Sequence, residues 1–281
     1  MRPYFLQIAL FVGLVFACGN LHAEFATVYL ADGNVSTVEL VAVDRGQIQW
    51  KEDTRPNTPI QSYLRSQINY IDFPSTEAWR NAENEFESGK FNEAIGLYRQ
   101  VIADPNSHFY PLPGNFVSLA HVRILECFRA LLNPAEVAKQ AAVVRQEKSN
   151  LPPDLRKPQP LIDAWIAISQ KKWEGALAAL ENVELPGPES FFLKGIALEN
   201  LGKSAEAIQE YSGVYVLNFG GSTMLTKEAL VRSGKLLTAQ EDDNRKPELQ
   251  AQAKIYRELF GDGKLWAGAP EWLGALAEEK I

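Results

Sequence analysis

Histidine and cysteine are the side chains that most readily serve as bases and nucleophiles, and the chain holds three histidines and two cysteines. His121 and Cys127 lie in a stretch predicted to be helical, at a spacing that puts them on roughly opposite sides of the helix. A catalytic nucleophile needs a base within hydrogen-bonding reach, so this pair does not predict catalysis. Cys127 stands among Ile124, Leu125 and Phe128, which favours a buried, unreactive thiol.

Other residue types that hold metals or phosphates are present in unsuitable patterns. The run Glu241-Asp242-Asp243 lacks the alternating ligands and central glycine of a calcium loop. The stretch LFGDGKLW has two glycines, but no strand leads into it and no Ser or Thr follows its lysine, as a phosphate-binding loop requires. His108 falls in the loop SHFYPLPG, interpreted as a structural connection. We therefore predict no catalytic residues, no metal site, no cofactor and no enzymatic activity.

The clearest pattern is a helical hairpin over residues 190–214. Its first helix carries Phe192, Ile196, Ala197 and Leu201 on one broad face. Asn200-Leu201-Gly202 ends that helix, since glycine enters the left-handed region at no steric cost. The second helix rebuilds an apolar face from Ala207, Ile208, Tyr211 and Val214. With Gly195 and Leu198, the residues Gly202, Ala207 and Tyr211 have the spacing of a tetratricopeptide repeat (TPR), which this hairpin resembles.

Similar hairpins follow one another from Ser75 onward. Residues 78–105 resemble the same repeat through Ala82, Phe86, Gly89, Phe91, Ala94, Tyr98 and Val101. Residues 115–146 form a looser copy without a glycine turn, and Trp173, Ala176 and Leu180 belong to a third. The hairpin at 190–214 is the fourth copy, and residues 223–260 form a fifth, degenerate copy. The second-helix alanines are expected at Ala94, Ala138, Ala176 and Ala207, at intervals of 44, 38 and 31 residues, so the array is irregular against the ideal 34.

The N-terminal residues 1–23 read as a secretory signal peptide. Arg2 precedes an apolar run from Tyr4 to Ala17, and Ala23 is the expected cleavage point. A membrane span is the alternative, but the run is shorter than the roughly 20 residues that a bilayer needs. A second alternative is lipidation of Cys18 in VFAC, which would anchor the chain to a membrane.

Residues 24–73 predict a small β module. FATVYL, VSTVELVAV, GQIQWK and INYIDF are rich in β-branched and aromatic residues and are separated by turn sequences. Their outline resembles the small SH3-like or Sm-like barrels. The formal net charge of the whole chain is −7, and removal of 1–23 with its one arginine and no acid gives 27 − 35 = −8. An acidic, exported chain excludes nucleic acid as the expected partner.

Together these features predict an α+β chain that is mainly helical. The expected order is a signal peptide (1–23), a small antiparallel β sheet or barrel (24–73), a TPR-like solenoid of helical hairpins (74–263) and a C-terminal capping helix (264–281). The resemblance implies a scaffold that binds protein partners on the concave face lined by the first helices. The candidate groove residues are Trp79, Glu83, Arg123, Trp165, Phe192, Ile196 and Asn200.

The expected location is the bacterial periplasm or the outer membrane. One alternative function is a lipoprotein subunit of an outer-membrane assembly machine, which Cys18 would anchor. Another is a cell-wall-acting hydrolase that uses the β module as its site, a hypothesis that the lack of a nucleophile–base pair disfavours.

Overall fold

The computed structural model describes residues 25–44, 47–53, 55, 57–104, 112–157, 159–217, 222–239 and 246–261. Several predictions lie outside these residues and stay predictions: the signal peptide with Cys18, the His108 loop, the run Glu241-Asp242-Asp243 and the capping helix at 264–281. Contacts divide the chain into two compact units, described separately below. The sheet unit holds most of the strand residues, and the helical unit holds the helices together with Asn69–Ile71.

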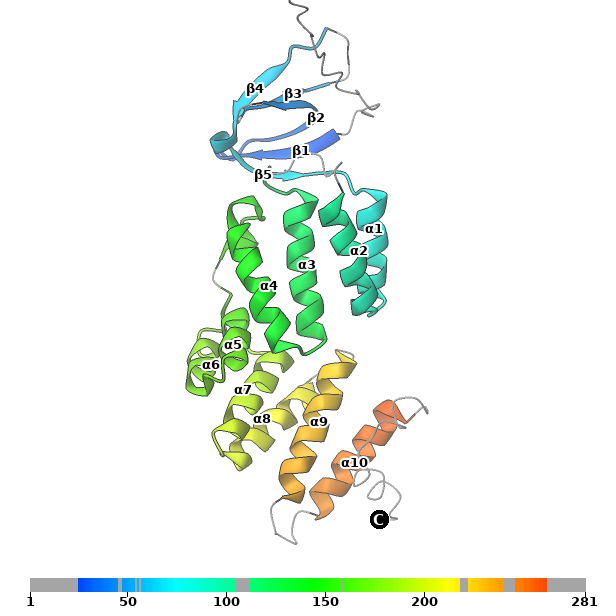
Figure 1. The fold of residues 1–281 in the computed structure, drawn as a ribbon, viewed down its shortest axis with the longest axis vertical. Coiled ribbons are helices and arrows are strands. Elements are labelled where there is room, and N and C mark those ends of the chain that lie inside the picture. Colours follow the sequence, from blue (N-terminus) through cyan, green and yellow to red (C-terminus); the bar gives the residue numbers. More distant parts are fainter. Residues whose placement is uncertain are drawn as a thin grey trace, which may run out of the picture. The chain divides into compact units, whose positions relative to one another are not determined.

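The sheet is a small five-stranded antiparallel one, which confirms the predicted β content (Figure 1). Its strands are β1 (Phe25–Leu30), β2 (Val35–Asp44), β3 (Gln47–Lys51), β4 (Gln61–Leu64) and β5 (Ile68–Asp72), in the spatial order β4-β3-β2-β1-β5. A short 3-10 turn (Arg65–Gln67) joins β4 to β5.

Alternation of buried and exposed side chains explains why these residues form strands. Val28, Val38 and Ile48 are fully buried, while their neighbours along each strand are more exposed. Trp50 is also buried, and its ring stacks on that of Tyr63 at 4.1 Å between centroids. One face of the sheet therefore supplies a core built on aliphatic and aromatic packing.

Most of the rest of the described chain is α-helical, with two short 3-10 turns after α4 (Lys148–Asn150 and Asp154–Arg156), so the mainly-α prediction is confirmed. The helices are α1 (Glu77–Glu87), α2 (Phe91–Ala103), α3 (Phe116–Ala130), α4 (Pro134–Gln146), α5 (Pro160–Ser169), α6 (Trp173–Leu180), α7 (Pro188–Asn200), α8 (Ser204–Leu217), α9 (Thr223–Thr238) and α10 (Lys246–Phe260). Helices adjacent in sequence pack on each other, so α1–α2, α3–α4, α5–α6 and α7–α8 are hairpins (Figure 1).

The same turn joins the helices in all four hairpins. A residue with positive φ follows each first helix: Gly89 (φ 72°), Leu132 (φ 53°), Lys171 (φ 57°) and Gly202 (φ 75°). The next residue donates its N–H to the carbonyl five residues back, at 2.9–3.0 Å, in Lys90–Glu85, Asn133–Phe128, Lys172–Ala167 and Lys203–Leu198. These are the hydrogen bonds of a left-handed helix cap, and they reverse the chain in the same way each time.

Counting from these turns gives the register of the second helices. The fifth residue after the turn is Ala94, Val137, Ala176 or Ala207, and each is 0 % exposed. The expectation that Ala138 takes this place in the second hairpin is wrong by one residue, and the intervals become 43, 39 and 31.

Large side chains fill the space between hairpins. Tyr98, Trp165, Phe192 and Tyr211 are at most 1 % exposed and belong to one continuous core. Smaller clusters hold α10 against its neighbours, around Leu230 and Tyr256 and around Leu237 and Leu249. Of the helices that the structure describes, none is both long enough and apolar enough to cross a lipid bilayer.

Candidate functional site

The seven predicted groove residues all lie on first helices of the hairpins. Trp79 and Glu83 are on α1, Arg123 is on α3, Trp165 is on α5, and α7 carries Phe192, Ile196 and Asn200. The structure brings Glu83 and Arg123 into direct contact. The aromatic residues and Ile196 pack within the helical core or at its edge, and Asn200 is exposed.

Glu83 and Arg123 form a two-point ion pair between α1 and α3. Arg123 Nε donates to Glu83 Oε1 at 3.0 Å, and Nη2 donates to Oε2 at 2.9 Å. The Tyr98 hydroxyl on α2 donates to the same carboxylate, and Arg123 Nη1 donates to Glu126 at 2.7 Å. The guanidinium also lies over the Phe86 ring, 5.0 Å from its centroid. Each polar group of this pair therefore has a partner within the helical unit.

A related arrangement recurs at the other end of the helical unit. Arg232 on α9 donates to Glu199 on α7 at 3.0 Å and to Glu228 at 2.9 Å. The Tyr211 hydroxyl on α8 donates to Glu199, as Tyr98 does to Glu83. Tyr98 and Tyr211 both stand nine residues after the hairpin turn. In these two hairpins, therefore, a buried tyrosine of the second helix bonds to a glutamate of the first helix, and an arginine of the following helix bonds to the same glutamate.

A third ion pair lies between the other two. Arg129 on α3 contacts Glu189 on α7 through two bonds of 3.0 and 2.6 Å. Here the aromatic donor is Trp165, whose Nε1–H bonds to Glu189 at 2.6 Å. We call the three clusters centred on Arg123, Arg129 and Arg232 the arginine–glutamate ladder. It links α1, α3, α7 and α9 across long stretches of sequence.

Burial and charge shape the protonation of these groups. Burial lowers the pKa of Arg123, but the hydrogen bonds that it donates to Glu126 and Glu83 outweigh this effect and raise the pKa above its ordinary value. The pKa of Arg129 is likewise raised, because its bond to Glu189 outweighs burial. Burial, followed by the neighbouring glutamate, raises the pKa of Tyr98 and of Tyr211. These pKa shifts keep the arginines charged and the tyrosines neutral at neutral pH, so the tyrosine hydroxyls act as donors.

The remaining predicted groove residues make packing contacts. The Trp79 ring lies 5.0 Å from that of Phe116 and 5.4 Å from that of Tyr98. The Phe192 ring lies 6.0 Å from that of Tyr211. Asn200 donates from Nδ2 to the carbonyl of Ile196 in its own helix, at 2.8 Å.

An open groove of about 920 Å³ lies beside the Arg129–Glu189 ion pair. It forms where the α1–α2 turn, the C-terminal end of α3 and the N-terminal ends of α7 and α9 meet. Arg129 and Glu189 line it together with Phe91, Leu132 and Met224. Met224 is 45 % exposed, so it adds accessible apolar surface to the groove. We call this feature the α3–α7 groove.

Reasoning from the sequence missed Arg129, Glu189, Leu132 and Met224. Arg129 and Glu189 are separated by 60 residues, so no local pattern connects them. Leu132 occupies a turn position where glycine is expected, so the sequence did not give the register of this hairpin. The one available signal was Pro188-Glu189, because proline followed by an acid is typical of the first turn of a helix.

Among the described residues, the cysteine Cys127 and the histidine His121 lie outside the lining of this groove. Cys127 is 0 % exposed, and burial raises the pKa of its thiol to about 12. His121 Nδ1 lies 3.1 Å from Gln140 Nε2, and burial lowers the pKa of its imidazole. Within the described ranges, no cluster of three or more His, Cys, Asp or Glu side chains is arranged to hold a metal ion.

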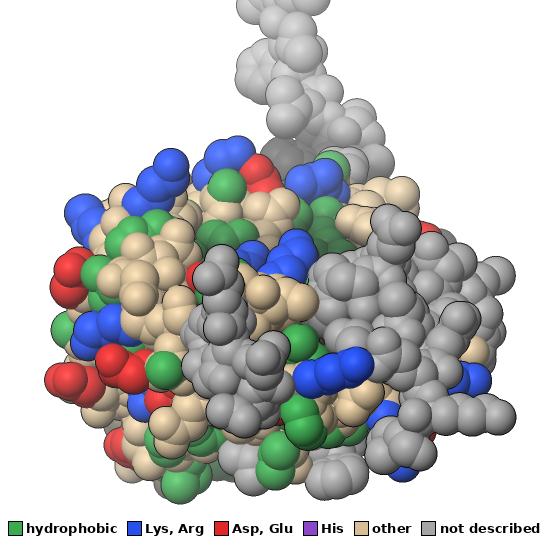
Figure 2. Space-filling view, turned by 90° about the horizontal axis from the view of Figure 1, so that it is seen from below, with side chains coloured by type: hydrophobic (Ala, Val, Ile, Leu, Met, Phe, Trp, Pro, Cys, Tyr) green, Lys and Arg blue, Asp and Glu red, His purple; other side chains and the backbone are tan. Residues whose placement is uncertain are grey.

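Basic side chains are dispersed on the face seen in Figure 2, where lysine and arginine lie among hydrophobic and uncharged residues. Protein-family models, curated proteins and solved structures were each compared with the chain, and none matches. The function proposed below therefore rests on the helical hairpins and the α3–α7 groove.

Proposed function

We propose that this protein is a non-enzymatic scaffold that binds a segment of a partner protein in the α3–α7 groove. The observation that carries the proposal is the groove itself, with an apolar floor at Phe91, Leu132 and Met224 beside the Arg129–Glu189 pair. An apolar floor with polar groups at its edge is the usual make-up of a surface that binds a peptide segment.

The helical hairpins, on this proposal, form a TPR-like array. Support comes from four turns with the same hydrogen bonds and from the buried position shared by Ala94, Val137, Ala176 and Ala207. Arrays of stacked hairpins present long surfaces on their first helices, and the ladder occupies the first helices of three hairpins and α9. Because the charged groups of the ladder bind one another, the ladder stabilises the arrangement of the helices. The groove, on this proposal, contacts the partner.

We further propose that the protein acts in the bacterial envelope after export, on the strength of residues 1–23. The motif VFAC favours a second candidate function, that of a lipid-anchored subunit of an outer-membrane assembly machine. Mass spectrometry of the mature N-terminus separates the two, because an acylated Cys18 and a free Glu24 differ in mass.

Site-specific photocrosslinking in whole cells tests the groove. A photoreactive amino acid replaces Met224 in the groove or, as the control, Leu185, which is 89 % exposed and lies outside the groove lining. The expected result is a discrete adduct with one partner from position 224 and none from position 185. Matching adduct patterns at both positions would contradict the proposal.

A charge reversal adds a matched pair of variants. Glu93 lines the groove, and Glu206 occupies the same place after its own hairpin turn but lies outside the groove lining. Both are exposed, and each follows a lysine three residues earlier. We expect Glu93→Lys to reduce the adduct formed at position 224 and Glu206→Lys to leave it unchanged.

A further inference from the structure

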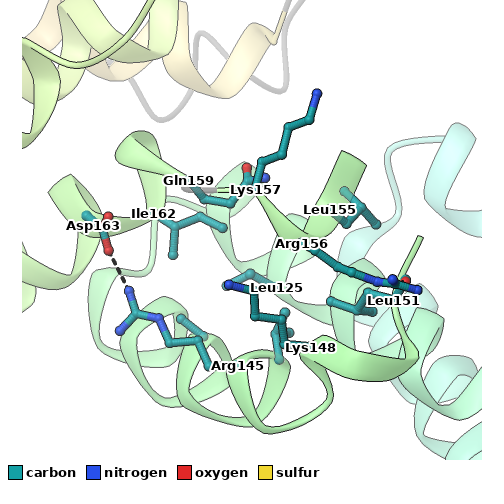
Figure 3. A pocket seen from close by; sticks show the side chains of 12 residues that line it. Leu125, Arg145, Lys148, Leu151, Leu155, Arg156, Lys157, Gln159, Ile162 and Asp163 are labelled. Atoms are coloured by element: carbon teal, nitrogen blue, oxygen red, sulfur yellow. Dashed lines mark hydrogen bonds and ion pairs between the residues drawn. The ribbon is translucent and has the colours of Figure 1, made fainter. Parts of the chain in front are cut away.

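A second, smaller cavity lies on another part of the helical unit, between α4, the loop at 147–159 and α5 (Figure 3). Its volume is about 160 Å³. An apolar cavity of roughly 150 Å³ accommodates a benzene molecule, so this one has room for a single side chain of that size. Its base is apolar, with Leu125, Ala141, Val144, Leu151, Leu155 and Ile162.

The rim of this cavity is strongly basic. Arg145, Lys148, Arg156 and Lys157 line it, against Asp163 as the one acid in the lining, so the formal charge is +4 − 1 = +3. The whole chain carries −7. A concentration of positive charge on an acidic protein favours an anionic ligand at this place.

The four cations differ in what holds them. Arg156 is fixed by the carbonyl of Leu151 at 2.7 Å and by that of Asn69 at 2.6 Å. Arg145 pairs with Asp163, and both side chains are largely exposed. Figure 3 shows Lys157 extending away from the other labelled side chains. Arg156 and Lys157 therefore contribute charge but are not placed to contact a ligand head group.

Lys148 is the cation best placed to take a new partner. It is exposed, and among the described residues no carboxylate lies within ion-pair distance of its amine. The adjacent Glu147 carboxylate is bonded to Ser118 at 2.8 Å and to Asn150 at 2.9 Å. That carboxylate is thus engaged with the start of α3 and the 3-10 turn that follows α4, and leaves Lys148 to solvent.

We propose that this cavity binds the carboxylate end of an apolar ligand, with one aromatic or branched side chain on the apolar base. The carboxylate bonds to Lys148 and to Arg145, which exchanges its contact with Asp163 for the ligand. Two sources offer this chemistry, the C-terminal residue of a polypeptide and a free apolar acid. The site is separate from the α3–α7 groove, so the test of this proposal does not depend on the function proposed above.

Calorimetric titration of the full chain with two matched pairs of probes tests the site. The first pair is N-acetyl-phenylalanine and its amide, and the second is an uncharged heptapeptide ending in leucine and its C-terminal amide. We expect each acid that binds to bind more tightly than its amide. If only the peptide acid binds, the ligand is a polypeptide C-terminus. If both acids bind, a single apolar residue with a free carboxylate is sufficient for binding.

Three variants sharpen the result. Lys148→Met should weaken binding of the acid roughly tenfold, because one hydrogen bond to a charged group is lost. Asp163→Asn should strengthen it roughly threefold, because Arg145 no longer has a competing carboxylate. Lys139→Met, on α4 and outside the lining, is the control and should leave affinity unchanged.

All three variants alter exposed side chains, so folding is preserved and circular dichroism checks it. Failure of both acids to bind at millimolar concentration would overturn the proposal. So would equal binding of acids and amides, or an affinity that Lys148→Met and Lys139→Met change equally.

Discussion

The Arg123 guanidinium on α3 and the Glu83 carboxylate on α1 meet through two parallel hydrogen bonds of 3.0 and 2.9 Å, although 40 residues separate them in sequence. The Tyr98 hydroxyl reaches the same carboxylate from α2. Side chains from three helices thus converge on one glutamate. This pair therefore couples the first hairpin to the second.

We expect Glu83→Gln to lower the free energy of unfolding by about 1–2 kcal/mol, because it leaves a partly buried arginine without one of its carboxylates. Urea unfolding measures the change. Glu87→Gln, at an exposed position in the same helix, should change it by less than about 0.5 kcal/mol. A double-mutant cycle with Arg123→Met should show coupling, and strictly additive losses would contradict a direct interaction.

The hairpin turns predict opposite effects for two exposed residues. Lys171 has φ 57°, a conformation that costs a non-glycine residue about 1–2 kcal/mol. Lys171→Gly should therefore raise the free energy of unfolding by about 0.5–1 kcal/mol, after allowance for the greater freedom of glycine in the unfolded chain. Gly202 occupies the same place with φ 75° and no atom within 4 Å of an added Cβ.

Gly202→Ala should accordingly lower the free energy of unfolding by about 1 kcal/mol, through backbone strain alone. Thermal and urea unfolding of both variants measure the two changes. If both substitutions shift stability in the same direction, the two turns are not equivalent.

Close packing between α7 and α8 leads to a third prediction. A Cβ built on Gly195 would lie 2.5 Å from the Tyr211 ring, which is 0 % exposed and cannot move aside freely. Gly195→Ala should therefore lower the free energy of unfolding by about 1–3 kcal/mol. In a Tyr211→Leu background the same change should cost less, because the ring is gone.

Gly96→Ala is the control for that substitution. Gly96 lies inside α2, is exposed, and has no atom within 4 Å of an added Cβ. Alanine should stabilise the helix there by about 0.5–1 kcal/mol. A gain in stability for Gly195→Ala equal to that for Gly96→Ala would show that helix propensity, not the tyrosine contact, decides the outcome.

Local spacing was enough to predict the helices and three of the four small second-helix positions. Ala94, Ala176 and Ala207 could be found because each follows its turn by five residues and because alanine permits close crossing. Val137 was missed because valine is not small and because the adjacent Ala138 matched the expected residue type. A left-handed conformation at leucine leaves no trace in the residue type.

The candidate site was harder to predict because its contacts are long-range. The sequence placed Glu83 and Arg123 on first helices but held no sign that they pair with each other. Trp165 and Phe192 are expected to line a groove because they lie on first helices, but both are buried in the core between the hairpins. The α3–α7 groove draws on residues from Phe91 to Met224, so its lining depends on how four helices meet.

The last prediction concerns pH and the buried thiol of Cys127. Burial, followed by the charge of Glu126, raises its pKa from 9.0 to about 12. Below pH 9 the thiol is protonated in both the folded and the unfolded chain, and the stabilisation is fully present. As pH rises from 9 toward 12, the unfolded chain loses this proton while the folded chain keeps it, so unfolding becomes more favourable.

We expect this group to lower the free energy of unfolding by about 1–2 kcal/mol between pH 9 and pH 10.5. Burial also raises the pKa of Tyr98 and Tyr211, which contribute in the same direction, so the informative quantity is the difference between wild type and Cys127→Ala. Urea unfolding at pH 8, 9.5 and 10.5 should give the steeper fall for wild type. In a chain with Cys18→Ser, the native thiol at pH 8 should react with a thiol reagent at the rate of unfolding, and rapid labelling of the folded protein would contradict its burial.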